Sequence, residues 1–224
     1  MNIKTLRILV FLSLTSFFTG CSRKGSGRLA ENYYKLSLDY LEGGSLQGYK
    51  QSLYYLDKAI LNNSQGNYYA LKATLLLRLG KEDEAEDAFK ESLSKDMNSK
   101  VKADVLNNYA CLLAEQDRGG EAYSLWQKLS RSKHYMTPEV ALFNQGKLLI
   151  LQKKYLMAKN KLLEAALYAP DYVDAHYYLA VLADRYLRDY KLAKQETDLV
   201  LYLEPSHSGA RALLKIISKK DCSC

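Results

Sequence analysis

The sequence predicts an all-α protein built from a repeated pair of antiparallel helices. From about Leu29 onward, apolar residues recur at spacings of three and four, the period of one face of an α-helix. Short breaks rich in glycine, asparagine or proline separate these stretches, and strand-like alternation is essentially absent. The same order of small, large and aromatic residues returns at intervals of 33 to 37 residues. Together these observations favour an array of stacked helical hairpins.

The N-terminal residues are typical of an export signal. Residues 1–7 contain Lys4 and Arg7 and no acidic residue, and residues 8–18 form an apolar run of 11 residues. A helix of that length is too short to span a bilayer, which takes about 20 residues. A buried amphipathic helix is the alternative, but the run has no polar face. A basic start followed by a short apolar segment predicts a secretory signal.

The end of the apolar run indicates where this signal is cut. Phe18-Thr19-Gly20-Cys21 resembles the bacterial lipobox, in which the signal is cleaved just before a cysteine that receives lipid. Small residues before the cysteine let a peptidase approach the backbone, and the thiol supplies the nucleophile for the thioether. We therefore expect a signal peptide over residues 1–20 and lipidation of Cys21. A plain secretory signal is the alternative.

Lipidation would place the chain on a membrane. Two or three acyl chains, palmitate among them, give stable anchoring where one chain is marginal. Ser22, rather than aspartate, follows the cysteine, which by the usual sorting rule of Gram-negative bacteria favours the outer membrane over the inner one. Residues 21–28 then form a short polar tether. The expected location is the periplasmic face of the bacterial outer membrane.

A repeat motif recurs along the rest of the chain. Its fullest copy is Gly146, Leu149, Tyr155, Ala158, Leu162, Ala165 and Pro170. This order resembles the tetratricopeptide repeat (TPR), position by position. A degenerate first copy reads as Leu36, Tyr40, Ser52, Leu56 and Ala59. In the five copies the small residue of the second helix is Ser52, Ala85, Ala122, Ala158 and Ala193.

The spacing has a physical reason. Two helix axes come close only where small residues meet, and large residues beside the contact fill the remaining groove. One hairpin cannot bury its apolar face alone, so neighbours stack into an α-solenoid superhelix. An unrelated helical bundle is the alternative. The predicted TPR array spans residues 29–209, with a capping helix over 210–220, a tail over 221–224, and repeats at 29–64, 65–100, 101–136, 137–170 and 171–205.

The sequence carries no pattern that predicts catalysis, a cofactor or a metal site. His134, His176 and His207 fall in different repeats without ligand spacing, and we expect His176 and His207 to be surface or capping residues. The net charge of +7 is scattered, without the basic stripe of a nucleic-acid site. Cys111 is expected to be an apolar filler, and Cys222 and Cys224 to lie in a frayed tail. We therefore expect a non-enzyme.

The TPR resemblance implies a binding groove. In this family the first helix of each repeat lines the concave face, where partner peptides lie. The groove would mix aromatic, aliphatic and amide side chains, which suits an amphipathic helix or an extended segment of another protein. Alternatively, some of its aromatic residues pack on the neighbouring repeat. The expected groove residues are Tyr34, Leu38, Ala70, Thr74, Asn107, Cys111, Phe143, Lys147, Tyr177 and Val181.

A narrower resemblance covers about residues 101–205. The residues that carry it are Asn107, Asn108, Tyr109, Ala110, Glu115, Gln116, Tyr135, Pro138, Glu139, Ala141, Asn144 and Gly146. This pattern resembles the third and fourth repeats of the type IV pilus biogenesis lipoproteins, the pilotin family, from which Ala110 and Gln145 depart. The resemblance implies an outer-membrane adaptor that binds the pilus secretin and promotes its localisation or multimerisation. A TPR scaffold lipoprotein for cell-wall enzymes or outer-membrane protein assembly is the alternative.

Overall fold

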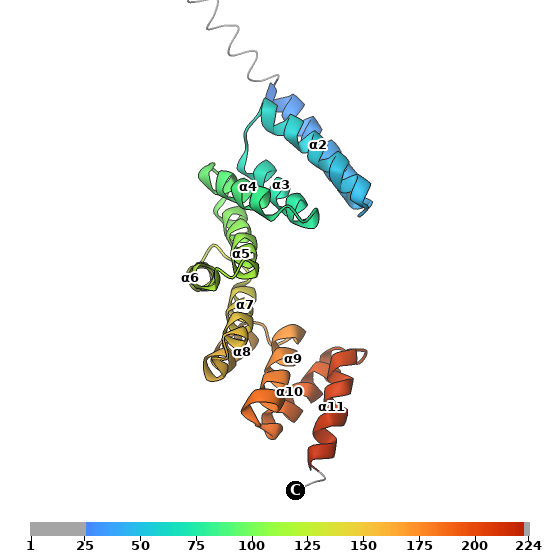
Figure 1. The fold of residues 1–224 in the computed structure, drawn as a ribbon, viewed down its shortest axis with the longest axis vertical. Helices are drawn as coiled ribbons and strands as arrows, with labels where there is room; N and C mark the ends of the chain where they lie inside the picture. The colour runs from blue at the N-terminus through green and yellow to red at the C-terminus, as the bar shows by residue number, and fades with distance from the viewer. Residues whose placement is uncertain (1–25, 222–224) are drawn as a thin grey trace, which may run out of the picture. The chain divides into compact units, whose positions relative to one another are not determined.

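The computed structural model describes residues 26–221, and this part of the chain is helical without a strand (Figure 1). The predicted signal peptide, Cys21, Cys222 and Cys224 lie outside the described residues. The chain divides into two compact units, Met1–Val101 and Lys102–Cys224. The prediction of an all-α TPR solenoid is confirmed, since successive helices pack as hairpins within each unit.

The first unit contains two hairpins. A helix over residues 26–42 packs beside α2 (Leu46–Asn62), and α3 (Gly66–Arg78) packs beside α4 (Glu82–Ser94). Buried serines fasten both pairs: Ser52 Oγ donates to the carbonyl oxygen of Ser37, and Ser92 Oγ to that of Gly66, each at 2.7 Å. These hydrogen bonds let a hydroxyl occupy a fully buried contact between helices.

The second unit continues the pattern, with α5 beginning in the last residues of the first. Its helices are α5 (Ser99–Glu115), α6 (Gly119–Leu129), α7 (Pro138–Leu151), α8 (Tyr155–Tyr168), α9 (Val173–Leu182), the π-helical turn η1 (Ala183–Leu187), α10 (Tyr190–Leu203) and α11 (Ser208–Asp221). Pro138 opens α7, where its missing N–H is no loss. The C-terminal helix α11 packs on α10.

Burial follows the predicted repeat positions in the second helices. Ser52, Ala85, Ala122, Ala158 and Ala193 have no exposed surface. In the fourth repeat, a Cβ added to Gly146 would lie only 2.9 Å from Leu162 Cδ2. The close approach of helices at small residues is therefore confirmed.

The first copy is shifted by one residue from its predicted register. Leu36 and Tyr40 are 39% and 41% exposed, whereas Ser37 is fully buried against α2. The two small residues of this repeat, Ser37 and Ser52, stand 15 positions apart, against 12 in the next three repeats. Because the turn is longer, the 12-residue interval between small residues does not hold in this repeat, and a register predicted from that interval is wrong for its first helix.

Three predicted boundaries also change. Residues 26–28, assigned to the tether, belong to the first helix, which therefore begins before residue 29. The capping helix begins at Ser208, two residues earlier than expected, and it takes in Asp221 from the predicted tail. The turn before this helix is short because His207 Nδ1 accepts a hydrogen bond from the backbone N–H of Ala210. His207 is thus a capping residue, as predicted.

A shared backbone feature closes the turn inside each hairpin. One residue there adopts positive φ, namely Gly44, Gly80, Asp117, Lys153 and Arg188 in the five repeats. A left-handed residue after a helix reverses the chain while the last carbonyls keep hydrogen-bond partners. Only the first two of these residues are glycine, and the other three are Asp117, Lys153 and Arg188.

The fifth repeat holds one additional residue between its small positions. Ala180 and Ala193 stand 13 positions apart, against 12 between Gly146 and Ala158. The π-helical turn η1 takes up this residue, because a π turn accommodates one insertion without breaking the helix. The repeat contacts on both sides of the insertion are kept, since Ala180 and Ala193 are both fully buried.

Candidate protein-binding groove

A hydrogen-bonded amide network joins the first helices of the third and fourth repeats. Asn144 Nδ2 on α7 donates to Asn107 Oδ1 on α5 at 3.4 Å and lies 3.8 Å from Cys111 Sγ. Trp126 Nε1 on α6 donates to the same Asn107 oxygen at 3.1 Å. Asn107 is therefore a half-buried acceptor that links three helices. Asn107 therefore holds neighbouring helices in position, because its oxygen already accepts hydrogen bonds from two donors.

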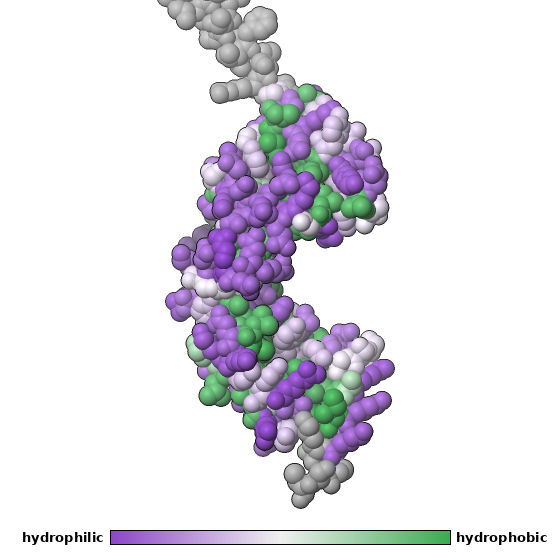
Figure 2. Space-filling model, viewed as in Figure 1, coloured by the Kyte–Doolittle hydropathy of each residue, from purple (hydrophilic) through white to green (hydrophobic). Residues whose placement is uncertain are grey.

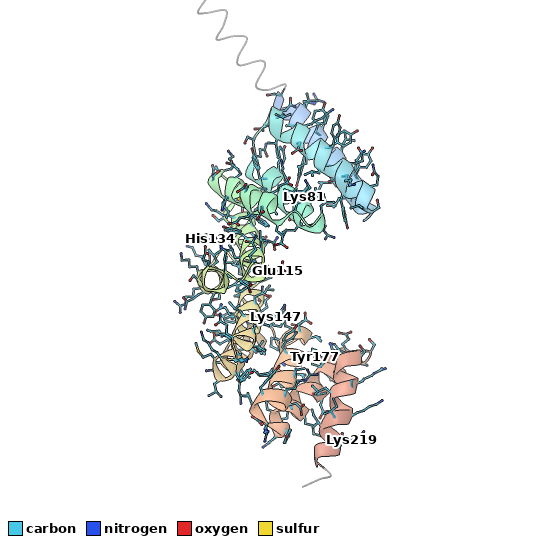
Figure 3. The ribbon with its side chains drawn as sticks, viewed as in Figure 1. Lys81, Glu115, His134, Lys147, Tyr177 and Lys219 are labelled. Carbon is cyan, nitrogen blue, oxygen red and sulfur yellow. The ribbon has the colours of Figure 1, made fainter. Side chains whose placement is uncertain are left out.

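A pocket of about 380 Å³ opens beside this network. Its apolar wall consists of Ala114, Trp126, Leu148 and Leu151, and its polar lining consists of Cys111, Glu115, Asp117, Asn144 and Lys147. Glu115 and Lys147, labelled in Figure 3, come from α5 and α7. The pocket thus combines a large apolar surface with charges of both signs, which suits a side chain of a bound polypeptide.

The cysteine in this pocket is not activated. Burial raises the pKa of the Cys111 thiol, and the negative charge of Glu115 raises it further, while Lys147 opposes both effects. The thiolate is the reactive form of cysteine, and a raised pKa keeps the thiol neutral at ordinary pH. Cys111 is half-buried between α5 and α7, in agreement with its predicted role as a filler.

Lys147 is held over aromatic rings rather than in an ion pair with Glu115. Its Nζ lies 5.4 Å from the ring centroid of Phe143 and 5.8 Å from that of Tyr178. A cation above the face of an aromatic ring is attracted to the ring's negative face. The lysine side chain is exposed, so its charge stays available at the rim of the groove.

Phe143 does not line the groove as predicted. It is only 6% exposed, and it packs edge-to-face against Tyr172 at 5.2 Å and Tyr178 at 5.1 Å. Tyr172 and Tyr178 cover the phenyl ring, so that it is buried between α7 and α9. Burial is also the main cause that raises the pKa of Tyr172 to about 12. The groove surface at this level comes instead from Asn144, Lys147 and Tyr178, of which only Lys147 was predicted.

The last predicted pair lies on α9. The Tyr177 ring lies 4.6 Å from the ring of His207, and a Cβ added to Gly209 would come within 2.5 Å of the Tyr177 hydroxyl. Glycine at this position therefore lets the tyrosine lie against the turn before α11. Val181 is half-buried beside the cluster formed by α9, α10 and α11. Tyr177 remains partly exposed and is labelled in Figure 3.

The first unit contributes its own stretch of first-helix surface. The Tyr34 ring stacks on Tyr68 with centroids 4.7 Å apart, and Leu38 is exposed. Ala70 and Thr74 on α3 are half-buried, and Thr74 Oγ1 donates to the carbonyl oxygen of Ala70 at 3.1 Å. The hydroxyl of Thr74 is thus occupied within its own helix, which leaves mainly apolar and aromatic surface here.

His176 differs from its prediction, because it is buried rather than a surface or capping residue. Its Nδ1 lies 2.6 Å from Glu196 Oε2, and its Nε2 lies 3.1 Å from the carbonyl oxygen of Pro170. Within residues 26–221, no group of three or more His, Cys, Asp or Glu side chains could hold a metal ion. No helix in that same range is long and apolar enough to cross a membrane.

Paired helices with fully buried small residues at the repeat period define a tetratricopeptide repeat protein. Within this class the chain resembles the type IV pilus assembly protein PilF of Pseudomonas aeruginosa, with 27% identity over 167 residues. This match covers 70% of the chain and 64% of PilF, so it spans a little under two thirds of the relative's length. No protein-family model matches the chain.

Solved structures agree with this resemblance. The structure of Pseudomonas aeruginosa PilF superposes with a TM-score of 0.72 and 25% identity over 88% of both chains. PilW, a widely conserved type IV pilus biogenesis factor, gives a TM-score of 0.72 at 21% identity, over 85% of this chain and 84% of PilW. YrrB, a TPR protein with an unusual peptide-binding site, gives 0.59 at 19% identity, over 82% and 90% of the two chains. The last two likenesses concern the fold.

Proposed function

We propose that this protein is a pilotin-like adaptor that binds the pilus secretin through its TPR groove and promotes secretin localisation and multimerisation. The observation that carries the proposal is the resemblance to PilF, which extends over 88% of both chains in structure. This resemblance disfavours the alternative of a scaffold for cell-wall enzymes. The role is non-catalytic, without a cofactor and without nucleic acid as a partner.

The surface of the second unit supports binding of a polypeptide. The pocket offers Trp126 and Leu148 to an apolar side chain, and Lys147 and Glu115 to charged groups beside it. Aromatic and aliphatic anchors surrounded by a few polar groups are the usual composition of such binding surfaces. A segment of the secretin would lie along α5, α7 and α9, with one large apolar side chain in the pocket.

The anchor is the second part of the proposal. Cys21 follows the apolar run and the small residues Thr19 and Gly20, an order that resembles the lipobox although Phe18 stands where leucine is commoner. Acyl chains on Cys21 would hold the adaptor at the inner face of the outer membrane, where the secretin ring forms. Binding and anchoring together would bring secretin subunits to one surface and so raise their effective concentration.

Deletion of the gene tests the functional role. We expect the deletion strain to lose secretin multimers on unheated denaturing gels, while secretin monomer persists on heated gels. Expression of the full chain from a plasmid should restore the multimers. Unchanged multimers in the deletion strain would reject the pilotin role, whatever the location of the protein.

A cysteine change tests the anchor separately. The Cys21→Ala variant should stay unmodified and appear in the soluble periplasmic fraction, whereas the wild-type protein fractionates with the outer membrane. Cys111→Ala is the matched control, because this thiol is half-buried between α5 and α7. Equal membrane retention of both variants and the wild-type protein would contradict lipidation of Cys21.

A further inference from the structure

The first hairpin of the described residues carries an exposed aromatic face. On the helix over residues 26–42, Leu29, Tyr33, Leu36 and Tyr40 follow one another at spacings of four, three and four, which places them on one stripe. Tyr54 and Tyr55 of α2 extend this stripe. These six residues are the N-terminal aromatic face: Leu29, Tyr33, Leu36, Tyr40, Tyr54 and Tyr55.

Contacts between the rings hold this face together. The Tyr55 ring lies 6.3 Å from Tyr33, 5.4 Å from Tyr40 and 5.2 Å from Tyr54. Leu29, Leu36, Tyr40 and Tyr54 are all among the exposed large hydrophobic residues. In Figure 2, hydrophobic patches are visible on this hairpin next to the point where the chain enters it. In the other repeats the position of Tyr40 is taken by buried residues such as Leu76 and Leu113.

Positive charge accompanies the tyrosines. Lys58 Nζ lies 4.4 Å from the Tyr54 ring centroid and 5.6 Å from that of Tyr33. Arg23, Lys24 and Arg28 lie between the predicted lipid site and the stripe. Tyrosine is enriched where a surface is both apolar and wet, as at the headgroup level of a bilayer, and lysine beside it reaches lipid phosphates.

The anchor limits how far this face can be from the membrane. Ser26, the first described residue of the first helix, is only five positions after Cys21. Five residues span at most about 18 Å even when fully extended, and the helix itself is about 25 Å long. An acyl chain on Cys21 therefore holds the start of the stripe within reach of the headgroups.

We infer that the N-terminal aromatic face rests on the membrane surface, with its tyrosines among phospholipid headgroups and Lys58 toward their phosphates. The inference rests on the proposed lipidation of Cys21, and it makes the first hairpin a second membrane contact beside the acyl chains. The hairpin would then be oriented by the bilayer rather than merely tethered to it.

Footprinting by hydroxyl radicals tests the inference with the mature chain. Cys111→Ala, Cys222→Ser and Cys224→Ser leave Cys21 as the single thiol, which is coupled to a maleimide lipid in phosphatidylethanolamine–phosphatidylglycerol vesicles. We expect oxidation of Tyr40 and Tyr54 to fall about fivefold relative to the same chain blocked with N-ethylmaleimide in solution. Tyr168 and Tyr202, which are exposed in the second unit, are internal controls and should be oxidised equally in both states.

The alternatives give different footprints. Equal oxidation of Tyr40 and Tyr54 in both states overturns the inference. Protection that appears without vesicles and grows with protein concentration assigns the face to a second copy, and protection that needs added secretin assigns it to the secretin; either result overturns it. Because the lipid is attached chemically, the outcome is independent of natural lipidation and of the secretin-binding role, which the strain experiments test separately.

A substitution provides a second measurement. In the N-ethylmaleimide-blocked chain, Tyr40→Ser with Tyr54→Ser should weaken sedimentation with the same vesicles about tenfold. The matched control is Tyr168→Ser with Tyr202→Ser, which removes two exposed tyrosines from α8 and α10 and should leave sedimentation unchanged. Circular dichroism melting verifies that both double variants are folded. Equal binding by the two variants would refute membrane contact by this face.

Discussion

His176 Nδ1 lies 2.6 Å from Glu196 Oε2, so that a hydrogen-bonded pair, ionic when the histidine is protonated, joins α9 to α10. The hydrogen bond that His176 donates to Glu196 is the largest cause that raises the pKa of His176 above its ordinary value of 6.5, against the opposing effect of burial. The carbonyl oxygen of Pro170 accepts from the other ring nitrogen and favours the same charged form. The imidazolium therefore has an acceptor on each side.

The pair predicts a pH dependence of stability. Because the pKa of His176 is higher in the folded than in the unfolded state, its contribution is complete below the unfolded value of 6.5. The contribution is lost as pH rises through the folded pKa. Glu196→Gln should lower the free energy of unfolding by about 1.5–3 kcal/mol near pH 6, the size of a hydrogen bond to a charged group.

Urea unfolding at several pH values provides the measurement. The difference between wild type and Glu196→Gln should shrink as pH increases from about 6 to about 9. Glu164→Gln serves as the control, because the Glu164–Lys161 pair on α8 is solvent-exposed and contains no histidine. A difference that stays constant over this range would show that His176 does not titrate in the folded protein.

Gln145 is a polar residue in the core that lacks one partner. Its Nε2 donates to the carbonyl oxygen of Ala141 at 3.4 Å, but its buried Oε1 accepts no hydrogen bond. Burying an unsatisfied acceptor costs about 1–3 kcal/mol, and removing it recovers part of that. Gln145→Leu should therefore raise the free energy of unfolding by about 1 kcal/mol in urea titrations.

An exposed glutamine is the control for this change. Gln127 on α6 is exposed, and Gln127→Leu should alter the free energy of unfolding by less than about 0.5 kcal/mol. Destabilisation by Gln145→Leu would contradict the interpretation, since it would mean that the amide oxygen has a partner or that leucine does not fit between the third and fourth repeats.

The repeat positions in the second helices could be predicted because each needs a small side chain, as Ala122 and Ala158 illustrate. This reasoning failed for the first repeat. Its longer turn places Ser37 15 positions before Ser52, whereas the small residues of the next three repeats are 12 positions apart. The groove was harder to predict because the exposure of a first-helix residue depends on the side chains that contact it from the adjacent helix. Phe143 is buried by Tyr172 and Tyr178, and no pattern within α7 encodes the contacts of those two rings on another helix.

Phe143 should therefore behave as a core residue. Phe143→Ala removes a ring packed between α7 and α9, and large-to-small changes of this kind cost about 3–5 kcal/mol. Thermal melting should show a clear decrease in the unfolding midpoint. Leu151→Ala on the same helix is the control, because Leu151 is 79% exposed and its loss should barely change the midpoint. Equal unfolding midpoints for the two variants would contradict a core role for Phe143 and favour its original assignment to the groove.

Lys147 provides the sharpest test of the groove. Of the residues that line the pocket it is the single basic one, and Glu115 and Asp117 are acidic. Lys147→Glu leaves only acidic residues among the charged side chains of the lining and opens no cavity, because the lysine side chain is exposed. We expect binding of purified secretin domains to weaken about tenfold in calorimetry, through lost attraction and new repulsion of acidic groups on the partner.

The control for Lys147 carries the same change of charge elsewhere. Lys128 is exposed on α6 and does not line the pocket, so Lys128→Glu should leave secretin binding within about twofold of wild type. Lys128→Glu should melt at the wild-type temperature, and Lys147→Glu only slightly below it, because it loses the contacts of Nζ with the Phe143 and Tyr178 rings; melting of both variants separates binding from folding. If the two variants weaken binding equally, net charge governs the interaction and the pocket is not its centre. A loss confined to Lys147→Glu places the partner's acidic group between α5 and α7.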